Sequence, residues 1–345
     1  MAREESAKVF GGRVLVFGDL HFSSSFSGQH KNYQYECYSN MDKITSLVKE
    51  NKASAVIFLG DLVGVNEKAI RDRQFLMRTM LFFETLNKLT NRHVFSVKGN
   101  HDMGDFTDFD LFQGMGYIKN PKYIDYYGIN SDTKKQSFEI RFHLVNYGDE
   151  HKPLNLAGND GFVTDVVLGH ADYYIEGVTN WYSAGTNIEL GKLDNFIGVD
   201  LVFSGHIHIP SDEILYTGMK DGSTVGLFFT GSPSRVAERF DDCWYLDFEY
   251  KKNLDGWSTE YESHYMGLDP AEQVFYPKED FIDVDEVETD EDVRALKSTK
   301  LTEIVKEVID SRIMSGDLNR QIDIMPGVSE EVKGIAKKYL ELASM

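Results

Sequence analysis

The sequence predicts an α/β fold in which two layers of β-sheet are flanked by helices. Between residues 13 and 250, short apolar runs alternate with longer helical stretches. This order is typical of βαβ units around a buried parallel or mixed sheet. Two further segments alternate apolar and polar residues with period two, which indicates half-buried strands of a second sheet layer. The length of 345 residues allows about two domains, or one large α/β unit with an appendage.

The first predicted strands are short and rich in β-branched and aromatic residues. They cover residues 14–17, 55–59, 94–97, 163–168 and 201–203. Apolar residues recur at helical spacing after the first two strands, so we expect a helix after each of them. The apolar positions of these helices are Met41, Ile44, Leu47 and Val48, then Phe75, Leu76, Phe83, Leu86 and Leu89. The period-two strands are predicted over residues 138–144 and 244–248.

The composition changes after residue 250. Asp and Glu occupy nine of the fifteen positions from 279 to 293, with no Lys or Arg among them, which predicts an extended connector. Two amphipathic stripes follow, interrupted by Met325-Pro326-Gly327, and Ser329 supplies an N-cap for the second helix. We therefore expect a domain over residues 13–250, a connector over 251–296 and a helix–loop–helix over 297–345.

The net charge restricts the function. The chain has 36 Lys and Arg against 56 Asp and Glu, a formal charge of −20, which argues against binding nucleic acid or an anionic membrane by bulk electrostatics. Hydrophobic residues at 41% exclude wholesale disorder, and no apolar run is long enough to span a bilayer. The two cysteines, Cys37 and Cys243, form no CxxC motif, and the N-terminus lacks the apolar stretch of a secretory signal. We expect a cytoplasmic protein.

Each of the five short strands ends in a glycine that is followed at once by a residue able to bind a metal. The pairs are Gly18-Asp19, Gly60-Asp61, Gly99-Asn100, Gly169-His170 and Gly205-His206. Because the carboxyl ends of neighbouring strands meet at one edge of a sheet, we expect these residues to form one site. His21 and His208 lie two residues beyond a ligand, a spacing that in an extended segment turns both side chains to one side.

The candidate ligands offer oxygen and nitrogen atoms and no thiolate. They are Asp19, His21, Asp61, Asn100, His170, His206 and His208. Seven ligands exceed one tetrahedral zinc site and suit two five- or six-coordinate ions that share a carboxylate, with Mn²⁺, Fe and Zn all open. Pairs of metal ions about 3.5–4 Å apart are typical of enzymes that cleave phosphoesters. The alternative is that these polar residues only form turns at strand ends.

His101 follows Asn100 directly, so its side chain projects in another direction. We assign His101 as the general acid that faces the leaving group, with Asp102 holding its imidazole in the protonated form. The alternative is that His101 only shapes the surroundings of the ligands. The other histidines are interpreted as surface or core-edge residues. They are His30, His93, His143, His151 and His264.

The ordered motifs resemble the five signatures of the calcineurin-like metallophosphoesterase superfamily. The matching segments are Gly18-Asp19-Leu20-His21, Gly60-Asp61, Gly99-Asn100-His101-Asp102, Gly169-His170 and Gly205-His206-Ile207-His208. The resemblance covers about residues 13–250 and implies a four-layer αββα sandwich with two metals. It implies one metal held by Asp19, His21, Asp61 and His208. The second metal would be held by Asp61, Asn100, His170 and His206.

The segment Gly231-Ser232-Pro233 looks like the corresponding strand end of SbcD-type nucleases of double-strand-break repair, and the chain is about as long as their large-phage relatives. This resemblance implies a Mn²⁺-dependent DNA exonuclease and endonuclease, with Mg²⁺ not excluded, in a bacterium or phage-infected cell. It also implies a homodimer in a heterotetramer with an SMC-like ATPase of the SbcC type, bound through the C-terminal helices. The SbcD-type nucleases usually carry a capping domain between the phosphoesterase core and the C-terminal helices. In this chain that domain would be reduced to residues 251–296. Arg235 and Arg239 are candidate DNA contacts.

Other functions stay open at this point. A dimetal phosphoesterase acting on small diesters or phosphoproteins would tolerate the negative charge more easily, and a non-catalytic scaffold is a third hypothesis. No Walker-type motif occurs, so any ATP-driven motion would come from a partner. The C-terminal helices have an alternative as well, which is a hairpin packed on its own core.

Overall fold

The chain divides into two compact units after Val274, and a computed structural model describes residues of the first unit only. The described residues are 5–23, 33–63, 73–104, 107–157, 163–174, 187–208, 210–211, 214–216, 222, 224–233, 242–254 and 256–268. The acidic stretch at 279–293 and the helix–loop–helix predicted over 297–345 lie outside them. Among the described helices, none has the length and apolar character needed to cross a membrane.

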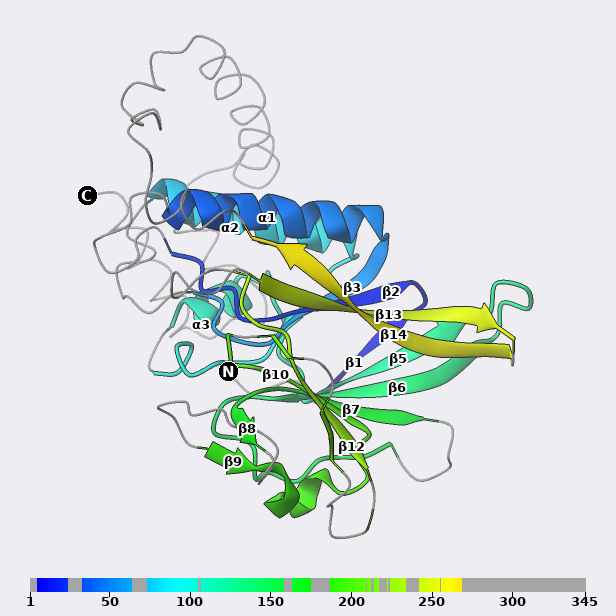
Figure 1. Ribbon diagram of the computed structural model, residues 1–345. Coiled ribbons are helices and arrows are strands. Elements are labelled where there is room, and N and C mark those ends of the chain that lie inside the picture. Colours follow the sequence, from blue (N-terminus) through cyan, green and yellow to red (C-terminus); the bar gives the residue numbers. More distant parts are fainter. Residues whose placement is uncertain are drawn as a thin grey trace. The chain divides into compact units, whose positions relative to one another are not determined.

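Two sheets stacked face to face form the first unit (Figure 1). The five-stranded sheet has the order β14-β13-β2-β3-β4. Its strands are β2 (Arg13–Phe17), β3 (Ala53–Phe58), β4 (Val94–Ser96), β13 (Asp242–Asn253) and β14 (Gly256–Gly267). Strands β2, β3 and β4 are parallel, and the β13–β14 hairpin adds to β2 in the antiparallel direction. This sheet therefore continues past residue 250, where the sequence places the end of the domain.

The second sheet has seven strands in the order β1-β5-β6-β7-β10-β12-β11. They are β1 (Ser6–Phe10), β5 (Tyr123–Ile129), β6 (Gln136–Val145), β7 (Thr164–His170), β10 (Leu201–Gly205), β11 (Ile214–Tyr216) and β12 (Val225–Phe229). A separate parallel pair consists of β8 (Asp172–Tyr174) and β9 (Asn187–Glu189). The predicted strand at 138–144 is β6 of this sheet. The one at 244–248 is β13, which lies instead between β14 and β2 in the five-stranded sheet.

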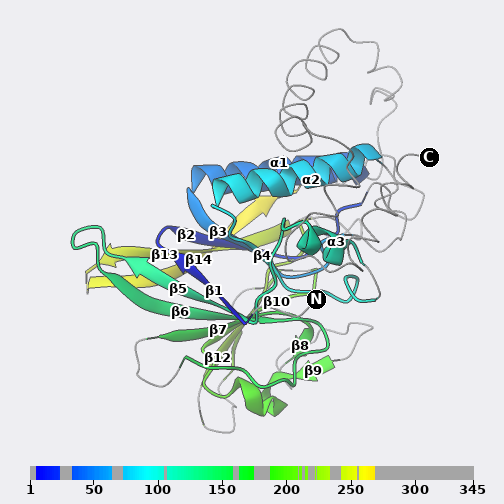
Figure 2. The same ribbon diagram turned by 180° about the vertical axis from the view of Figure 1, so that it is seen from behind.

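Helices α1 (Tyr33–Glu50) and α2 (Arg73–Leu89) cover the outer face of the five-stranded sheet, as Figures 1 and 2 both show. They follow β2 and β3, as the apolar spacing predicts. In α1 the buried apolar residues recur every three or four positions and face the sheet. They are Tyr33, Cys37, Met41, Ile44 and Val48. A short helix, α3 (Asp108–Gly114), begins with a capping box between Thr107 and Asp110.

Strand β2 shows why the predicted strands are apolar throughout. Leu15 and Phe17 pack in the core under the helices, whereas Val14 and Val16 pack in the core between the two sheets. Successive side chains of a strand point to opposite faces, so a strand covered on both faces must be apolar at every position. The continuous apolar run is therefore the signature of an inner layer.

The outer face of the seven-stranded sheet carries a third core. Val167 of β7 and Val202 of β10 pack there with Leu190, Leu193 and Phe196. Leu190 and Phe196 come from two 3₁₀ turns, Leu190–Lys192 and Asp194–Phe196, and Leu193 lies between these turns. The α/β fold class with two sheets is confirmed. In the described chain, 3₁₀ turns cover this face where the family resemblance implies α-helices.

Candidate metal centre

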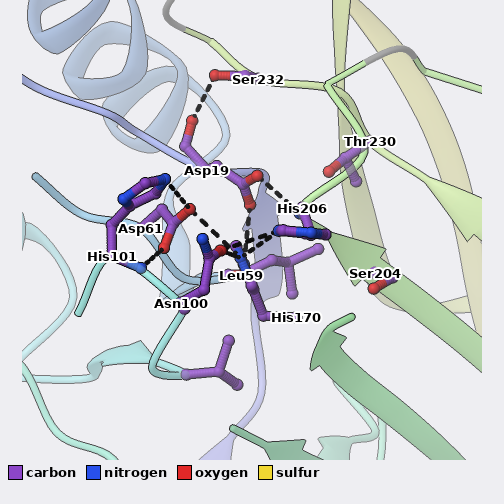
Figure 3. Close-up of polar contacts among 12 residues, drawn as sticks. Asp19, Leu59, Asp61, Asn100, His101, His170, Ser204, His206, Thr230 and Ser232 are labelled. Atoms are coloured by element: carbon purple, nitrogen blue, oxygen red, sulfur yellow. Dashed lines mark hydrogen bonds and ion pairs between the residues drawn. The ribbon is translucent and has the colours of Figure 1, made fainter. Parts of the chain in front are cut away.

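The predicted ligands converge where strands of both sheets end (Figure 3). Asp19 and His21 follow β2, Asp61 follows β3, and Asn100 follows β4. His170 is the last residue of β7, and His206 and His208 follow β10. Strands β2, β3 and β4 are parallel within one sheet, and β7 and β10 are parallel within the other, so each set delivers its loops to one edge.

Three groups of these side chains place their ligand atoms within 4.8 Å of one another. The groups are Asp19, His21 and His208; then His21, Asp61 and His101; and finally Asp61, His170 and His206. In the first group, His208 Nε2 lies 3.4 Å from Asp19 Oδ2 and 3.0 Å from His21 Nε2. A carboxylate and two imidazoles at these separations suit a divalent transition metal.

The remaining ligands gather on the other side of Asp61. Its Oδ2 lies 3.3 Å from His170 Nε2 and 3.5 Å from His21 Nε2, so this one oxygen faces both halves of the site. The Nδ1 atom of His206 lies 2.9 Å from Asn100 Oδ1 and 3.2 Å from His170 Nε2. Asp61 therefore has the position required of a carboxylate shared by two ions.

The protein atoms leave part of this site unsatisfied. Asp19 and His170 are fully buried and Asp61 is 1% exposed. In the described part of the chain, neither Asp19 Oδ1 nor His21 Nδ1 has a hydrogen-bond partner, and the nearest charged group to Asp19 Oδ1 is the His170 ring, whose Nδ1 lies 3.4 Å away and is bonded to the Leu59 carbonyl oxygen. A buried carboxylate oxygen without a donor is costly, and a bound cation removes that cost. The donor set and the unsatisfied Asp19 oxygen together fit divalent metal binding.

The charges of the site depress the pKa values of both carboxyl groups. Burial alone would raise the pKa of Asp61, but the charge and hydrogen bond of His170 lower it to about 2. Burial alone would also raise the pKa of Asp19. The charges and hydrogen bonds of His170 and His208 outweigh burial, so the pKa of Asp19 lies well below its ordinary value. Conversely, burial lowers the pKa of His21 to about 4. The metal-free site therefore holds two carboxylates and a neutral His21 at pH 7.

Strained backbone holds three of the ligands in place. His21, Asp61 and His206 have φ values of +45°, +43° and +72°, in the left-handed region that residues with a Cβ rarely adopt. Such conformations cost about 1–3 kcal/mol each and concentrate at functional sites. Gly205 is required for a different reason, because a Cβ there would lie 2.5 Å from the Leu59 carbonyl oxygen and would collide with Asp19.

His101 lies at the mouth of the site and its side chain is 31% exposed. Its Nε2 is 3.9 Å from Asp61 Oδ2, and its backbone N–H donates to Asp61 Oδ1 at 2.9 Å. The imidazole ring is thus beside the metal ligands and open to a substrate. This placement is compatible with the predicted general acid.

Asp102 is buried in the turn that follows Gly99. It is 2% exposed, and its Oδ2 accepts the Gly99 N–H at 2.9 Å. Burial and the charge of Asp61 raise its pKa well above the ordinary value. No described contact joins Asp102 to the His101 imidazole, because the turn after Gly99 directs the carboxyl group inward. Through its bond to the Gly99 N–H, Asp102 stabilises the turn that carries Asn100 and His101, and its role in orienting His101 stays a prediction.

Sequence reasoning missed Asp172 and Tyr147. The Asp172 carboxyl is buried, and its Oδ1 lies 3.2 Å from Nε2 of His206, the ring nitrogen that faces away from the other ligands. The Tyr147 ring packs 6.0 Å from that of His206 and 6.3 Å from that of His170. Asp172 follows His170 by two residues, the same spacing that marks His21 and His208, so this signal was available. Nothing in the sequence around Tyr147 distinguishes it.

The Gly231-Ser232-Pro233 segment lies at the site as well. The Ser232 hydroxyl donates to the backbone oxygen of Asp19 at 2.8 Å (Figure 3). The candidate DNA contacts Arg235 and Arg239 come directly after this segment and lie outside the described residues.

The family of this protein follows from its sequence and agrees with the geometry. The calcineurin-like phosphoesterase family matches residues 12–210, which is more than half of the chain and contains every candidate ligand. The chain belongs to the calcineurin-like phosphoesterases. It is therefore a member of a family of metal-dependent phosphoester hydrolases that bind two divalent metals.

The solved structures resemble the chain only distantly. A putative 5'-nucleotidase from Staphylococcus aureus, in complex with α-ketoglutarate, is 12% identical with a TM-score of 0.38. The match covers 82% of this chain and 58% of that one, so this chain spans less than two thirds of its length. A dimetal phosphatase from Danio rerio is 11% identical with a TM-score of 0.39, covering 75% of this chain and 99% of that one. No curated protein matches the sequence.

Proposed function

We propose that this calcineurin-like phosphoesterase is a two-metal phosphodiesterase that cleaves DNA, the nuclease subunit of an SbcCD-type complex. The observation that carries the proposal is the Gly231-Ser232-Pro233 strand end, whose Ser232 hydroxyl is hydrogen-bonded to the backbone of the metal-ligand residue Asp19. This segment is the feature that resembles SbcD-type nucleases within the family. The His101 and His208 side chains are 31% and 20% exposed, so a substrate phosphate can reach this side of the site.

The residues of the site have separate tasks in this reaction. Asp19, His21 and His208 would hold one ion, Asn100, His170 and His206 the other, and Asp61 would be shared. Bound divalent ions supply Lewis-acid stabilisation of the phosphate and lower the pKa of water. His101, on the exposed side of Asp61, would donate a proton to the leaving oxygen. Asp172 would fix the orientation of the His206 ring through its Nε2 atom.

The partner is part of the proposal. An acidic chain supplies the cutting centre but little electrostatic attraction for DNA, so an SMC-like ATPase of the SbcC type would hold the duplex. The predicted helices over residues 297–345 would bind this ATPase. Deletion of residues 298–345 should abolish co-purification with the ATPase, and retained binding would refute this docking role.

A DNA digestion assay tests the nuclease function. The full-length protein with Mn²⁺ should cut linear duplex and single-stranded DNA, and the ATPase should increase cutting of the duplex. Asp61→Ala should abolish activity and reduce the number of bound metals. Asp132→Ala, at a carboxyl group 57% exposed, is the matched control and should behave as wild type.

The second candidate function is hydrolysis of small diesters or phosphoproteins, which the net charge of −20 favours. Hydrolysis of bis(p-nitrophenyl) phosphate without any cutting of DNA, with Mn²⁺ and the ATPase both present, would support it against the nuclease. If the protein is instead a non-catalytic scaffold, it should cut neither substrate and bind no metal.

A further inference from the structure

A pocket of about 490 Å³ lies between the two sheets, apart from the metal ligands. Phe228 of β12 lines it from the seven-stranded sheet, and Trp244 of β13 and Tyr261 of β14 line it from the five-stranded sheet. Ser211, Glu262 and His264 contribute polar groups. The volume falls within the range of about 300–1,000 Å³ that is usual for small-molecule sites.

Aromatic rings make up the walls of this pocket. The Phe228 and Tyr261 rings are perpendicular at 6.0 Å, a geometry that holds both against movement. Trp244 meets Tyr265 edge to face at 6.4 Å, and Tyr265 is 57% exposed. The indole of Trp244 is only partly buried, although it lies on the same face of its strand as the buried core residues Leu246 and Phe248. An aromatic wall with the Ser211 and Ser263 hydroxyls among its lining residues suits a flat heteroaromatic ligand, whereas the His264 ring stacks on Tyr245 at 5.2 Å on the other face of the sheet.

The charge of the pocket indicates which part of a ligand would bind there. Among the described lining residues Glu262 is the one carboxylate, and the Lys251 ammonium lies 3.2 Å from that carboxylate. The described lining therefore offers one compensated acid and no Lys or Arg that would attract a phosphate. An uncharged ring that can stack and also accept or donate hydrogen bonds fits better.

The pocket is connected to the metal centre by short segments of chain. Ser211 is three residues from His208, which limits the separation of their Cα atoms to about 10–11 Å. The backbone N–H of Trp244 donates to Thr230 O at 2.8 Å, and Thr230 is two residues from Ser232, which holds the Asp19 backbone. A group seated in the pocket is therefore close to a phosphodiester at the metals.

We propose that this pocket binds an unpaired nucleobase of a DNA strand, stacked on Trp244, while a neighbouring phosphodiester of the same strand lies at the metal centre. The inference rests on the proposed nuclease function and names how its substrate is held. It gives an acidic protein a means of holding single-stranded DNA that does not require positive charge.

Binding of defined strands to the full-length protein tests this proposal. In EDTA, where no strand is cut, a thymidine oligonucleotide should bind more tightly than the same sugar-phosphate chain without bases. Loss of one base stack costs about 1–3 kcal/mol, which corresponds to about 5- to 150-fold in affinity. Trp244→Ala should weaken binding of the oligonucleotide by this factor, and Trp244→Phe should retain most of it.

Two controls separate the pocket from other effects. Trp257→Ala removes a tryptophan that stacks on Tyr250 outside the pocket, and it should leave binding unchanged. With Mn²⁺, Trp244→Ala should hydrolyse bis(p-nitrophenyl) phosphate as wild type does, which shows that the metal centre is intact. If the Trp244→Ala protein does not fold, the comparison of base-containing and abasic strands on the wild-type protein still tests whether the protein binds the bases of a strand.

Equal binding of the two strands to the wild-type protein would overturn the proposal, as would binding to neither. Thymidine 5'-phosphate that competes as well as the oligonucleotide would show that the pocket serves a mononucleotide and not a strand. These outcomes do not depend on cleavage. If the wild-type protein fails to cut DNA but binds the base-containing strand preferentially, the nuclease proposal fails and the base pocket stands.

Discussion

Replacing Gly205 with alanine would show whether the packing of the metal ligands requires glycine at the strand ends. The new Cβ would lie 2.5 Å from the Leu59 carbonyl oxygen and 3.0 Å from His170 Nδ1, and it would collide with Asp19 Oδ1. The Leu59 oxygen belongs to the backbone and already accepts from His170 Nδ1 at 2.7 Å, so it cannot move cheaply. We expect the Asp19 carboxylate to be displaced.

The magnitude follows from these contacts. Overpacking of a well-packed interior costs about 1–3 kcal/mol in free energy of unfolding. Displacement of Asp19 would also weaken the bond from the His206 N–H to Asp19 Oδ2, which is 2.7 Å long. Loss of a group that positions metal ligands lowers metal affinity about 10- to 100-fold. Gly205→Ala should therefore lower both metal-free stability and Mn²⁺ affinity.

Urea unfolding in EDTA would measure the first effect, and calorimetric titration with Mn²⁺ the second. Gly267→Ala is the matched control, because its new Cβ would meet its nearest atom, Tyr265 Cε1, at an ordinary 3.4 Å. It should change the free energy of unfolding by less than about 0.5 kcal/mol. A Gly205→Ala protein with wild-type stability and wild-type Mn²⁺ affinity would refute the reasoning.

Three further predictions concern the same site. His101→Ala should slow DNA cleavage by about 10²–10⁴, the usual contribution of general acid catalysis. It should have far less effect on bis(p-nitrophenyl) phosphate, whose leaving group needs no proton, and equal losses on both substrates would exclude a general acid. Asp172→Asn should lower Mn²⁺ affinity about 10- to 100-fold in a titration, because Nε2 of His206 loses its carboxylate partner; unchanged affinity would exclude that role. Finally, metal binding at pH 7 should release a proton from His170. Burial lowers the pKa of this ring, but the charges of Asp61 and Asp19 outweigh burial and raise it well above the ordinary value, so the metal-free ring is protonated. Affinity should rise with pH, and binding heats should differ between buffers of different ionisation enthalpy. Identical binding heats in all buffers would contradict the release of a proton from His170.

The clustering of the candidate ligands was predictable from the sequence because each of them is tied to a local pattern. A buried inner strand must be apolar on both faces, and the chain must turn sharply where it ends, so each apolar run followed by glycine and a polar residue identifies a ligand position. The same reasoning predicts helices α1 and α2 from their apolar spacing. It does not extend to the contact of Asp102 with the Gly99 N–H, because which way a side chain points after a turn depends on the φ and ψ values of that turn.

Sheet membership was not predictable from the same patterns. The period-two segment of β13 indicates a half-buried strand, but the pattern does not say which sheet the strand joins. Pairing of β13 with β2 brings together residues more than two hundred positions apart, and backbone hydrogen bonds carry no sequence code for such a partner. For the same reason the walls of the pocket, which come from β12, β13 and β14, were not visible in the sequence.

The sequence by itself determined the phosphoesterase motifs, the seven candidate ligands and the alternating α/β order, because these depend on residue type and short-range spacing. The tertiary structure alone decided that Asp61 faces both halves of the site, that Asp172 and Tyr147 adjoin His206, and that Trp244 lines a pocket near the metals. The relations of Asp61 and Trp244 join strands of two sheets, and those of His206 join the ends of β6, β7 and β10, which are neighbours within one sheet. Both kinds depend on long-range pairing or stacking of strands, which brings such distant residues into contact.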